Sequence, residues 1–244
     1  MKNAVFNTIV FVVALIVGFL IFEYALPKYI KDGGPLVILL ITLFIMLLAV
    51  VVERLLSLNK ASGKDQLPRF LQAVQKAVNN GDIDGAITLC DKQRGSCANV
   101  IRTGLERYKT LVEEGDIKGQ RDMMESIQGA IEEATMLEVP LLERNLPVMS
   151  TIASIGTMVG LLGTVLGMIR SFSAMARTGA PDAVQLALGI SEALINTAGG
   201  LLSGIGGIVA YNFFVTKIDN FTYMIDEASY AIIQSLVSRK PSKK

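Results

Sequence analysis

An ionisable residue, Glu192, lies in one of the most apolar parts of this 244-residue chain. It falls in the stretch GISEALINTAGGLLSGIGG (189–207), which also contains Asn196, Thr197 and Ser203. A charged side chain facing lipid costs ~3 kcal/mol or more, so an ionisable residue inside a membrane segment is a functional candidate by default. The pattern predicts that Glu192 points into an interface or an ion path. A hydrogen-bonded glutamate that only holds helices in register is the structural alternative.

Helical spacing separates the small and polar residues of this stretch from the bulky ones. At about 100° per residue, one face contains Glu192, Asn196, Gly199, Ser203, Gly206 and Ala210, with Ala193, Thr197, Gly200 and Gly204 beside them. Bulky aliphatic side chains take the other half of the circumference. The bulky half is predicted to face lipid or neighbouring helices, and the small and polar half to face protein or water.

A second polar stripe lies in LPVMSTIASIGTMVGLLGTVLGMIRSF. Hydroxyl residues recur at every seventh position, at Ser150, Thr157, Thr164 and Ser171, which places them along one side of a helix. Ser150 and Ser171 lie near the ends and are interpreted as hydroxyls bonded back to their own helix. For Thr157 and Thr164, which lie deeper, conduction and packing both stay open.

Both stretches carry small residues at the four-residue spacing that allows membrane helices to approach closely. The spacing occurs between Gly156 and Gly160 and again between Gly163 and Gly167. The residues predicted to serve helix packing are Gly156, Gly160, Gly163, Gly167, Gly199, Gly200, Ser203 and Gly204.

Four apolar runs approach or exceed the roughly 20 residues that a helix needs to cross about 30 Å of hydrocarbon. They are 5–22, 35–52, 147–169 and 183–215. The chain has 51% hydrophobic residues and a mean hydropathy of +0.48, and these values predict an integral membrane protein. The first run is followed by no small-residue cleavage site, so we interpret it as a retained helix rather than a signal peptide.

Basic residues set the predicted orientation, because cytoplasmic loops of membrane proteins are rich in Lys and Arg. The segment 53–145 holds many of them, and the C-terminal segment holds Lys217, Arg239, Lys240, Lys243 and Lys244. The other two loops contain only Lys28 with Lys31, and Arg177. Both rich segments are therefore predicted to be cytoplasmic, with both termini inside.

Composition argues against several other classes of function. A net charge of +1 is unlike that of a nucleic-acid-binding domain. The chain has no histidine, and the spacing of Cys90 and Cys97 matches no zinc pattern, so no metal site is predicted and both cysteines are interpreted as ordinary thiols. P-loop, G-x-S-x-G and H-E-x-x-H motifs are lacking, so we expect neither an enzyme nor a bound cofactor.

The segment between the second and third apolar runs is predicted to be helical. Phe70, Val74 and Val78 have helical spacing, and NNGD, RGS and EEGD mark breaks. From about Lys118 the helical pattern is predicted to continue straight into the third apolar run. We interpret this bundle as a stalk built on extended transmembrane helices rather than as an independent domain.

These patterns predict an all-α integral membrane protein whose long transmembrane helices extend into a cytoplasmic helical bundle. The predicted segments are an extra N-terminal hydrophobic helix with a short loop on the non-cytoplasmic side (1–34), a transmembrane helix (35–58), a cytoplasmic helical region (59–146), a transmembrane helix (147–170), a second non-cytoplasmic loop (171–186), a transmembrane helix (187–215) and a cytoplasmic C-terminal tail (216–244).

Two stretches together resemble the paired transmembrane signatures of the MotA/TolQ/ExbB proton-channel family. They are TIASIGTMVGLLGTVLGMIRSF and GISEALINTAGGLLSGIGGIVAYN, and VVERLLSL and NNGDIDGAITLC are similar to the ExbB and TolQ branch. The resemblance implies a homopentamer in the bacterial inner membrane, surrounded by membrane lipid, whose pore encloses an ExbD-like or TolR-like dimer of single-span subunits. It also implies that the helices 147–170 and 187–215 line the channel and that the loops within 1–34 and at 171–186 are periplasmic. Each of these partner helices would carry an intramembrane aspartate. Proton flow would rotate the partner and pass work to a TonB-like or TolA-like protein.

Site residues follow from the resemblance by position. Thr164 of GLLGTVLG and Thr197 of EALINTAGG match the threonines that line the family's proton path, and Glu192 matches its glutamate. Thr157 and Asn196 complete the predicted channel lining. Rows of hydroxyls with a carboxylate fit protons, although threonine oxygens also coordinate sodium.

Two features depart from the family pattern. Gly206 stands where the family usually has a proline, so a kink in the fourth span would depend on glycine flexibility. The apolar run 5–22 is additional to the usual three spans.

Three functions remain compatible with the sequence, and we rank them in the following order. The first is the ring subunit of a proton-driven energiser, of either TonB type or Tol type. The second is a secondary transporter, which would need a broken helix or an internal repeat of spans. The third is a membrane scaffold in which the polar faces only hold helices together.

Overall fold

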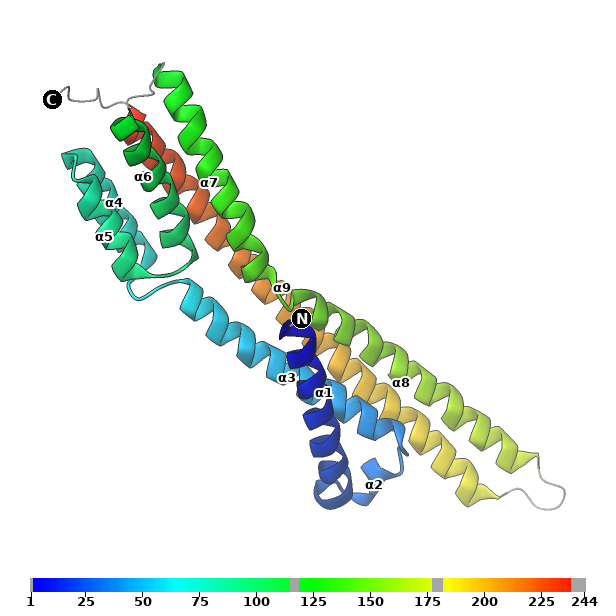
Figure 1. Cartoon of the computed structure of the whole chain (residues 1–244). Helices are drawn as coiled ribbons and strands as arrows, with labels where there is room; N and C mark the ends of the chain where they lie inside the picture. The colour runs from blue at the N-terminus through cyan, green and yellow to red at the C-terminus, as the bar shows by residue number, and fades with distance from the viewer. Residues whose placement is uncertain (1, 115–118, 177–181, 238–244) are drawn as a thin grey trace. The chain divides into compact units, whose positions relative to one another are not determined.

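The computed structural model describes residues 2–114, 119–176 and 182–237, and its regular elements within these ranges are all helical (Figure 1). In chain order they are α1 (Lys2–Leu20), the π-helical turn η1 (Ile21–Ala25), α2 (Lys28–Lys31), α3 (Leu36–Ala61), α4 (Leu67–Asn80), α5 (Ile83–Gln93), α6 (Ser96–Glu114), α7 (Gln120–Glu143), α8 (Leu146–Met175) and α9 (Ala183–Val237). Four segments are long and apolar enough to cross a membrane. The predicted all-α membrane class is confirmed over the described residues.

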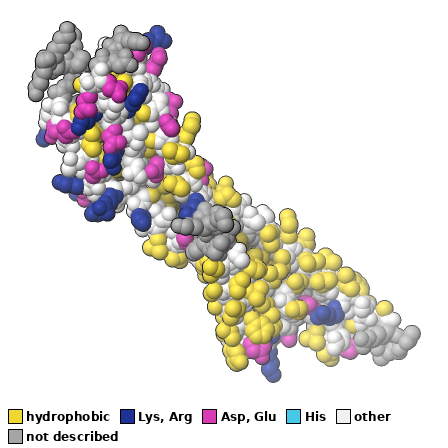
Figure 2. All heavy atoms as spheres, viewed as in Figure 1, with side chains coloured by type: hydrophobic (Ala, Val, Ile, Leu, Met, Phe, Trp, Pro, Cys, Tyr) yellow, Lys and Arg dark blue, Asp and Glu magenta, His cyan; other side chains and the backbone are white. Residues whose placement is uncertain are grey.

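The chain divides into two compact units. The first comprises the described residues of Met1–Glu53 and Asn145–Phe214, and the second those of Arg54–Arg144 and Val215–Lys244. Helices α3 and α9 therefore contribute to both units. On the face seen in Figure 2, hydrophobic side chains cover most of the first unit, whereas charged side chains gather on the second.

The first unit contains the additional N-terminal helix. Its small residues Ala14 and Gly18 are buried, whereas most of its large side chains are exposed. A Cβ atom at Gly18 would lie 2.9 Å from the Thr42 hydroxyl oxygen of α3, so α1 packs on α3 through its small residues. The apolar run 5–22 is thus a helix attached to the second apolar run, and whether it crosses the membrane stays a prediction.

The predicted uninterrupted helix from about residue 118 into the third apolar run is corrected by the structure. Residue 118 lies outside the described residues, and the helix is broken between α7 and α8. Arg144 is extended (φ −51°, ψ 136°), and Asn145 is left-handed (φ 67°), a conformation that asparagine adopts more readily than most residues. Pro147 follows in the first turn of α8, where its missing N–H is tolerated. The Asn145 side chain donates a hydrogen bond to Glu53 (3.0 Å).

Helices α8 and α9 extend beyond the predicted segment ends. Helix α8 continues to Met175, and α9 begins at Ala183 and continues unbroken through Gly206 to Val237. Residues 216–237 are therefore helical rather than a tail, and the remaining basic residues of that tail lie outside the described ranges. The extension is helical because one apolar face is buried in the second unit, formed by Ile218, Phe221, Ile225, Ile232 and Leu236.

The second unit has its own apolar core. Helices α4 to α6 contribute Val74, Val78, Ile101 and Leu105, which are all essentially inaccessible to solvent. Close packing of α6 on α7 depends on Gly104, since a Cβ there would lie 2.7 Å from Ile131. This unit thus buries apolar side chains along each of its helices.

Two free thiols, Cys90 and Cys97, are buried in this unit. The pKa of each thiol is raised from 9.0 to about 12, mainly by burial, and the charge of Asp91 contributes to this rise at Cys90. Because the thiolate is the reactive form, we expect neither cysteine to react with a disulfide reagent such as DTNB at pH 8 in the folded protein. Both should react after denaturation. Rapid labelling of the native protein would contradict this expectation.

The same shift predicts how stability depends on pH. Thiols of the unfolded chain ionise near pH 9.0, whereas those of the folded chain ionise near pH 12. The unfolded state therefore loses protons first, and the free energy of unfolding should fall as the pH rises from about 9 towards 12. Unfolding midpoints measured across this range should fall less steeply in a Cys90→Ala, Cys97→Ala variant.

Candidate functional site

Helices α8 and α9 lie side by side and antiparallel, and close backbone contacts set their register (Figure 1). A Cβ atom at Gly160 would lie 2.8 Å from the Cα of Gly200, and one at Gly156 would lie 2.9 Å from the Cβ of Ser203. Backbones approach this closely only where side chains are absent or very small. The two helices therefore form a seam of small residues along the membrane-spanning hairpin.

The structure brings most of the predicted packing residues into this seam. Gly163 faces Asn196, Gly167 faces Ala193, and Gly204 faces Thr157. Gly199 lies outside the seam, since a Cβ there would lie 3.1 Å from Leu40 of α3. The small face of α9 thus serves two neighbours, α8 and α3.

Two threonine hydroxyls meet across the seam. The Thr164 and Thr197 hydroxyls are hydrogen-bonded to each other, and each also lies within bonding distance of a carbonyl of its own helix, Gly160 (3.2 Å) and Ala193 (2.9 Å). A hydroxyl has one proton and two acceptor lone pairs, so only one of the two can donate to the other at a time. The pair has two hydrogen-bonded arrangements, with the shared bond running in opposite directions. Such a pair can pass a proton or orient water that does so.

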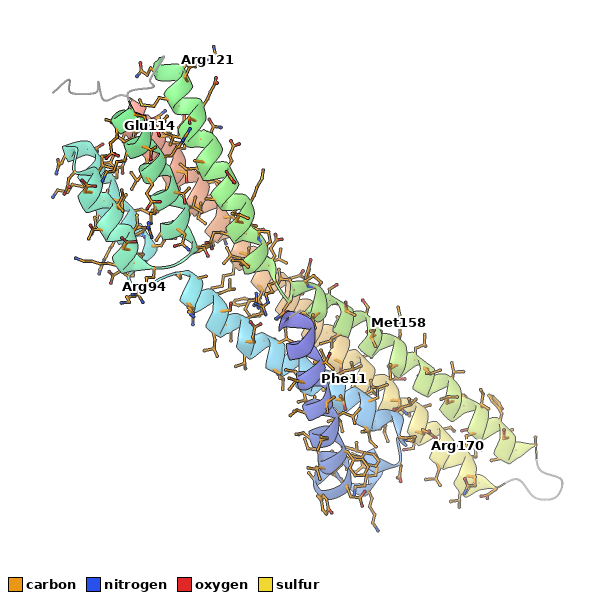
Figure 3. The ribbon with its side chains drawn as sticks, viewed as in Figure 1. Phe11, Arg94, Glu114, Arg121, Met158 and Arg170 are labelled. Carbon is orange, nitrogen blue, oxygen red and sulfur yellow. The ribbon has the colours of Figure 1, made fainter. Side chains whose placement is uncertain are left out.

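Glu192 is buried and paired with a residue that the sequence analysis did not single out. Its side chain is 5% exposed, and its carboxylate accepts a hydrogen bond from the Arg170 guanidinium and forms an ion pair with it. Figure 3 shows the position of Arg170 on α8. Arg170 is itself 57% exposed. Arg170 is the lone basic residue in the third apolar stretch, and that isolation was the signal available in the sequence. The ion pair supplies the charge compensation that a buried carboxylate requires.

The loop before α3 closes over the same carboxylate. Gly34 has φ +74°, and a Cβ there would lie 2.9 Å from a carboxylate oxygen of Glu192. Asn196 is fully buried, and its amide donates hydrogen bonds to the carbonyls of Gly33 (2.7 Å) and Glu192 (2.9 Å). Its side-chain oxygen has no hydrogen-bond partner among the described residues. The loop of Gly33 and Gly34 is therefore part of the site, although no sequence pattern indicated it.

The hydroxyls near the two ends of α8 differ from each other. Ser171 is buried and donates to the Leu186 carbonyl of α9 (3.1 Å), so the predicted bond to its own helix is corrected. This contact is possible because Gly189 leaves room opposite Ser171. The Ser150 hydroxyl makes no hydrogen bond with a described residue, so its predicted bond to its own helix is corrected as well. Thr157, two turns further along α8, is exposed and donates to Ala153 of its own helix (3.0 Å).

Thr164, Arg170, Glu192, Asn196 and Thr197, together with the loop of Gly33 and Gly34, form what we call the polar cluster. The small-residue seam and all of the polar cluster except the loop lie within a region shared with a known family. A sequence model of the MotA/TolQ/ExbB proton channel family matches residues 92–227, which is more than half of the chain. The chain belongs to the MotA/TolQ/ExbB proton channel family. No curated protein sequence matches the chain.

Membership gives the hairpin a functional context. Proteins of the MotA/TolQ/ExbB family form oligomeric proton-channel complexes with partner proteins. The four apolar helical segments agree with a multi-pass membrane protein of this family. The matched range contains all of α8 and α9 as far as residue 227, and therefore every residue of the polar cluster except the loop before α3.

Proposed function

We propose that this family member is the ring-forming subunit of an inner-membrane motor of the ExbB–ExbD type. It would be driven by the proton-motive force and would energise TonB-dependent transport across the outer membrane. The single observation that carries the proposal is the bonded hydroxyl pair Thr164–Thr197 next to the Glu192–Arg170 ion pair. The motifs VVERLLSL and NNGDIDGAITLC, similar to the ExbB and TolQ branch, support the choice of branch.

The threonine hydroxyls of the site can relay protons, whereas its other residues hold the helices in place. Threonine hydroxyls pass protons by exchanging hydrogen bonds but do not store them, so a titratable carrier is needed beside them. Glu192 is already held by Arg170 and enclosed by the loop of Gly33 and Gly34. We therefore assign the carrier to an aspartate on an ExbD-like single-span partner, and the Glu192–Arg170 ion pair joins the two helices that carry the hydroxyl pair.

Protonation of such a carrier couples flow to movement. An ionised aspartate is costly to move past apolar helix faces, by ~3 kcal/mol, whereas the protonated form is not. A ring of five identical subunits would present the hydroxyl pair five times around the pore, with the C-termini on the cytoplasmic side. Each protonation then allows the partner to advance by one subunit. A TonB-like protein would receive the resulting mechanical work.

Thr197→Val tests the proposal, because valine keeps the shape of threonine and removes its hydroxyl. Thr164 can still donate to the Gly160 carbonyl, so no buried polar atom loses its partner and the fold should persist. We expect proton flux to fall by about tenfold or more, the factor that corresponds to about 1.4 kcal/mol. The full chain, purified with its native partner, is reconstituted in liposomes. An internal pH-sensitive dye then reports proton uptake driven by a potassium diffusion potential.

Thr151→Val is the matched control, because Thr151 is an exposed hydroxyl of α8 that donates to its own helix (2.7 Å). This variant should conduct at the rate of the unmodified protein. Unchanged flux in Thr197→Val would rule out the proposed path. Mass spectrometry of the co-purified partner decides the branch, since an ExbD-like sequence supports the TonB type and a TolR-like sequence the Tol type.

A further inference from the structure

A groove of about 370 Å³ lies on the α8–α9 hairpin, at the opposite end of the hairpin from Arg170 and Glu192. Four of its seven lining residues carry hydroxyls, namely Ser150, Ser154, Thr157 and Tyr211, and we call it the hydroxyl groove. Ala153, Met158 and Ile208 complete its lining, and Figure 3 shows where Met158 and Arg170 lie along α8. The groove belongs entirely to the first unit.

The hydrogen bonds of these hydroxyls leave the groove able to hold water. Ser154 and Thr157 donate to carbonyls of their own helix, at 3.1 and 3.0 Å, and their oxygens keep lone pairs that accept from water. The hydroxyls of Ser150 and Tyr211 make no hydrogen bond with a described residue. A bound water needs two to four polar partners, and the four hydroxyls together with neighbouring waters can supply them within the volume of this groove.

A second groove of the same unit shows the contrast. It measures about 510 Å³ between α3 and α9, and its lining is aliphatic and aromatic apart from Ser203 and the hydroxyl of Tyr29. Ser203 donates to its own helix (3.1 Å). Such a lining suits lipid chains, whereas the hydroxyl groove, although apolar over most of its lining, carries four hydroxyls that can bond water.

The hydroxyl groove and the threonine pair are separated along the hairpin. Thr157 precedes Thr164 by two helical turns, which is about 10 Å. Between their levels the facing residues are Gly160 and Gly200, whose backbones are in contact and leave no room for water. Close backbone packing at Gly160 and Gly200 therefore forms a dry step in the seam between the hydroxyl groove and the threonine pair.

We propose that the hydroxyl groove is a hydrated vestibule in which protons enter or leave the path at this end of the hairpin. The inference rests on the proposed function and adds the aqueous connection on the far side of the dry step. A protonated carboxyl carrier that reaches the groove gives its proton to a water as its own O–H bond breaks. The excess proton then passes from water to water, and the carrier returns ionised.

Water accessibility can be measured without any flux. Ser154→Cys is introduced into the full chain in its complex and treated with a membrane-impermeant, positively charged methanethiosulfonate. Native Cys90 and Cys97 are buried and should contribute little background. Ile155→Cys is the matched control, because Ile155 is an exposed apolar residue at the same depth of α8 and does not line the groove. We expect Ser154→Cys to be labelled at least tenfold faster than Ile155→Cys.

Flux then tests whether the vestibule lies on the path. A double variant, Ser154→Ala with Thr157→Val, should reduce proton flux by about tenfold while retaining the partner, and Thr151→Val should not. If Ser154→Cys is labelled no faster than Ile155→Cys, the groove is covered by lipid or protein and the inference is wrong. It is equally wrong if the double variant conducts normally.

Those two failures leave the proposed function intact, provided that Thr197→Val still lowers proton flux by about tenfold or more. Normal flux in Thr197→Val would instead overturn the proposed function itself.

Discussion

Replacing Gly200 with valine should prevent α8 and α9 from closing and leave little folded protein. A Cβ at this position would lie 2.6 Å from the Cα of Gly160 and 2.8 Å from the carbonyl oxygen of Gly156. Both are backbone atoms, which cannot rotate away as a side chain could. Overpacking commonly costs about 1–3 kcal/mol, and we expect a loss at or above the upper end because the whole helix must move. The thermal unfolding midpoint and the yield of monodisperse complex in detergent measure the effect.

Gly129→Val is the control for this prediction. Gly129 is an exposed residue within α7, and a Cβ there would meet nothing within 4 Å. Valine has a better helix propensity than glycine, so this variant should be unchanged or more stable by a few tenths of a kcal/mol. A Gly200→Val protein that unfolds at the same temperature as the Gly129→Val protein would show that the seam is not closely packed.

Neutralising Arg170 should destabilise the protein more than neutralising both members of its ion pair. Arg170→Gln leaves the buried Glu192 carboxylate without its cation, at a cost of about 2 kcal/mol. This is below the roughly 3–5 kcal/mol of a fully buried pair, because the Arg170 side chain is 57% exposed and partly screened by solvent. The double variant Arg170→Gln, Glu192→Gln should recover most of the loss, since no buried charge remains. Thermal unfolding of the four proteins gives the coupling free energy.

An exposed ion pair provides a control double-mutant cycle. Arg121 and Glu125 lie one turn apart on α7, and 3.1 Å separates Nε of Arg121 from Oε1 of Glu125. Both side chains are largely in solvent. Their coupling should be about 0.3–0.5 kcal/mol, the usual value for such pairs. If the coupling free energy of Arg170 and Glu192 is no larger than that of Arg121 and Glu125, the buried ion pair adds no more stability than an exposed one.

The same variants separate the energiser from a scaffold. In a scaffold, Glu192→Gln would change the unfolding temperature and leave proton flux unaltered. In the proposed motor, the substitution reduces flux as well, because the Glu192–Arg170 ion pair joins the two helices that carry Thr164 and Thr197.

Much of the fold follows from local patterns in the sequence. The apolar runs at 35–52 and 147–169 exceed or approach the span length and have no other stable conformation in lipid, because every backbone polar group must be bonded within the segment. The helical period and the sizes of the residues together also predicted which face of each helix carries the small residues. The family signature lies in the same residues, so membership could be anticipated from the sequence and was confirmed by the match over 92–227.

Segment ends were less predictable. Helix α9 continues past residue 215 because its apolar face is buried by helices from distant parts of the chain, which no local pattern reveals. The break at Asn145 depends on a left-handed residue whose side chain bonds Glu53, 92 positions away in sequence. Local helical periodicity therefore predicted a continuous helix through Asn145, where the structure has a break. It also predicted a helix end at residue 215, where α9 continues.

The sequence by itself determined the kind of residue in the polar site, and only the tertiary structure decided the partners. It indicated Thr164, Thr197 and Glu192, but the pairing of Glu192 with Arg170 depends on the register of two antiparallel helices. That register is set by the sum of contacts along the small-residue seam, which no single position specifies. The contact of Asn196 with Gly33 joins residues 163 positions apart. It exists because α3 and α9 pack together, and packing is a property of surfaces that the linear order of residues does not display.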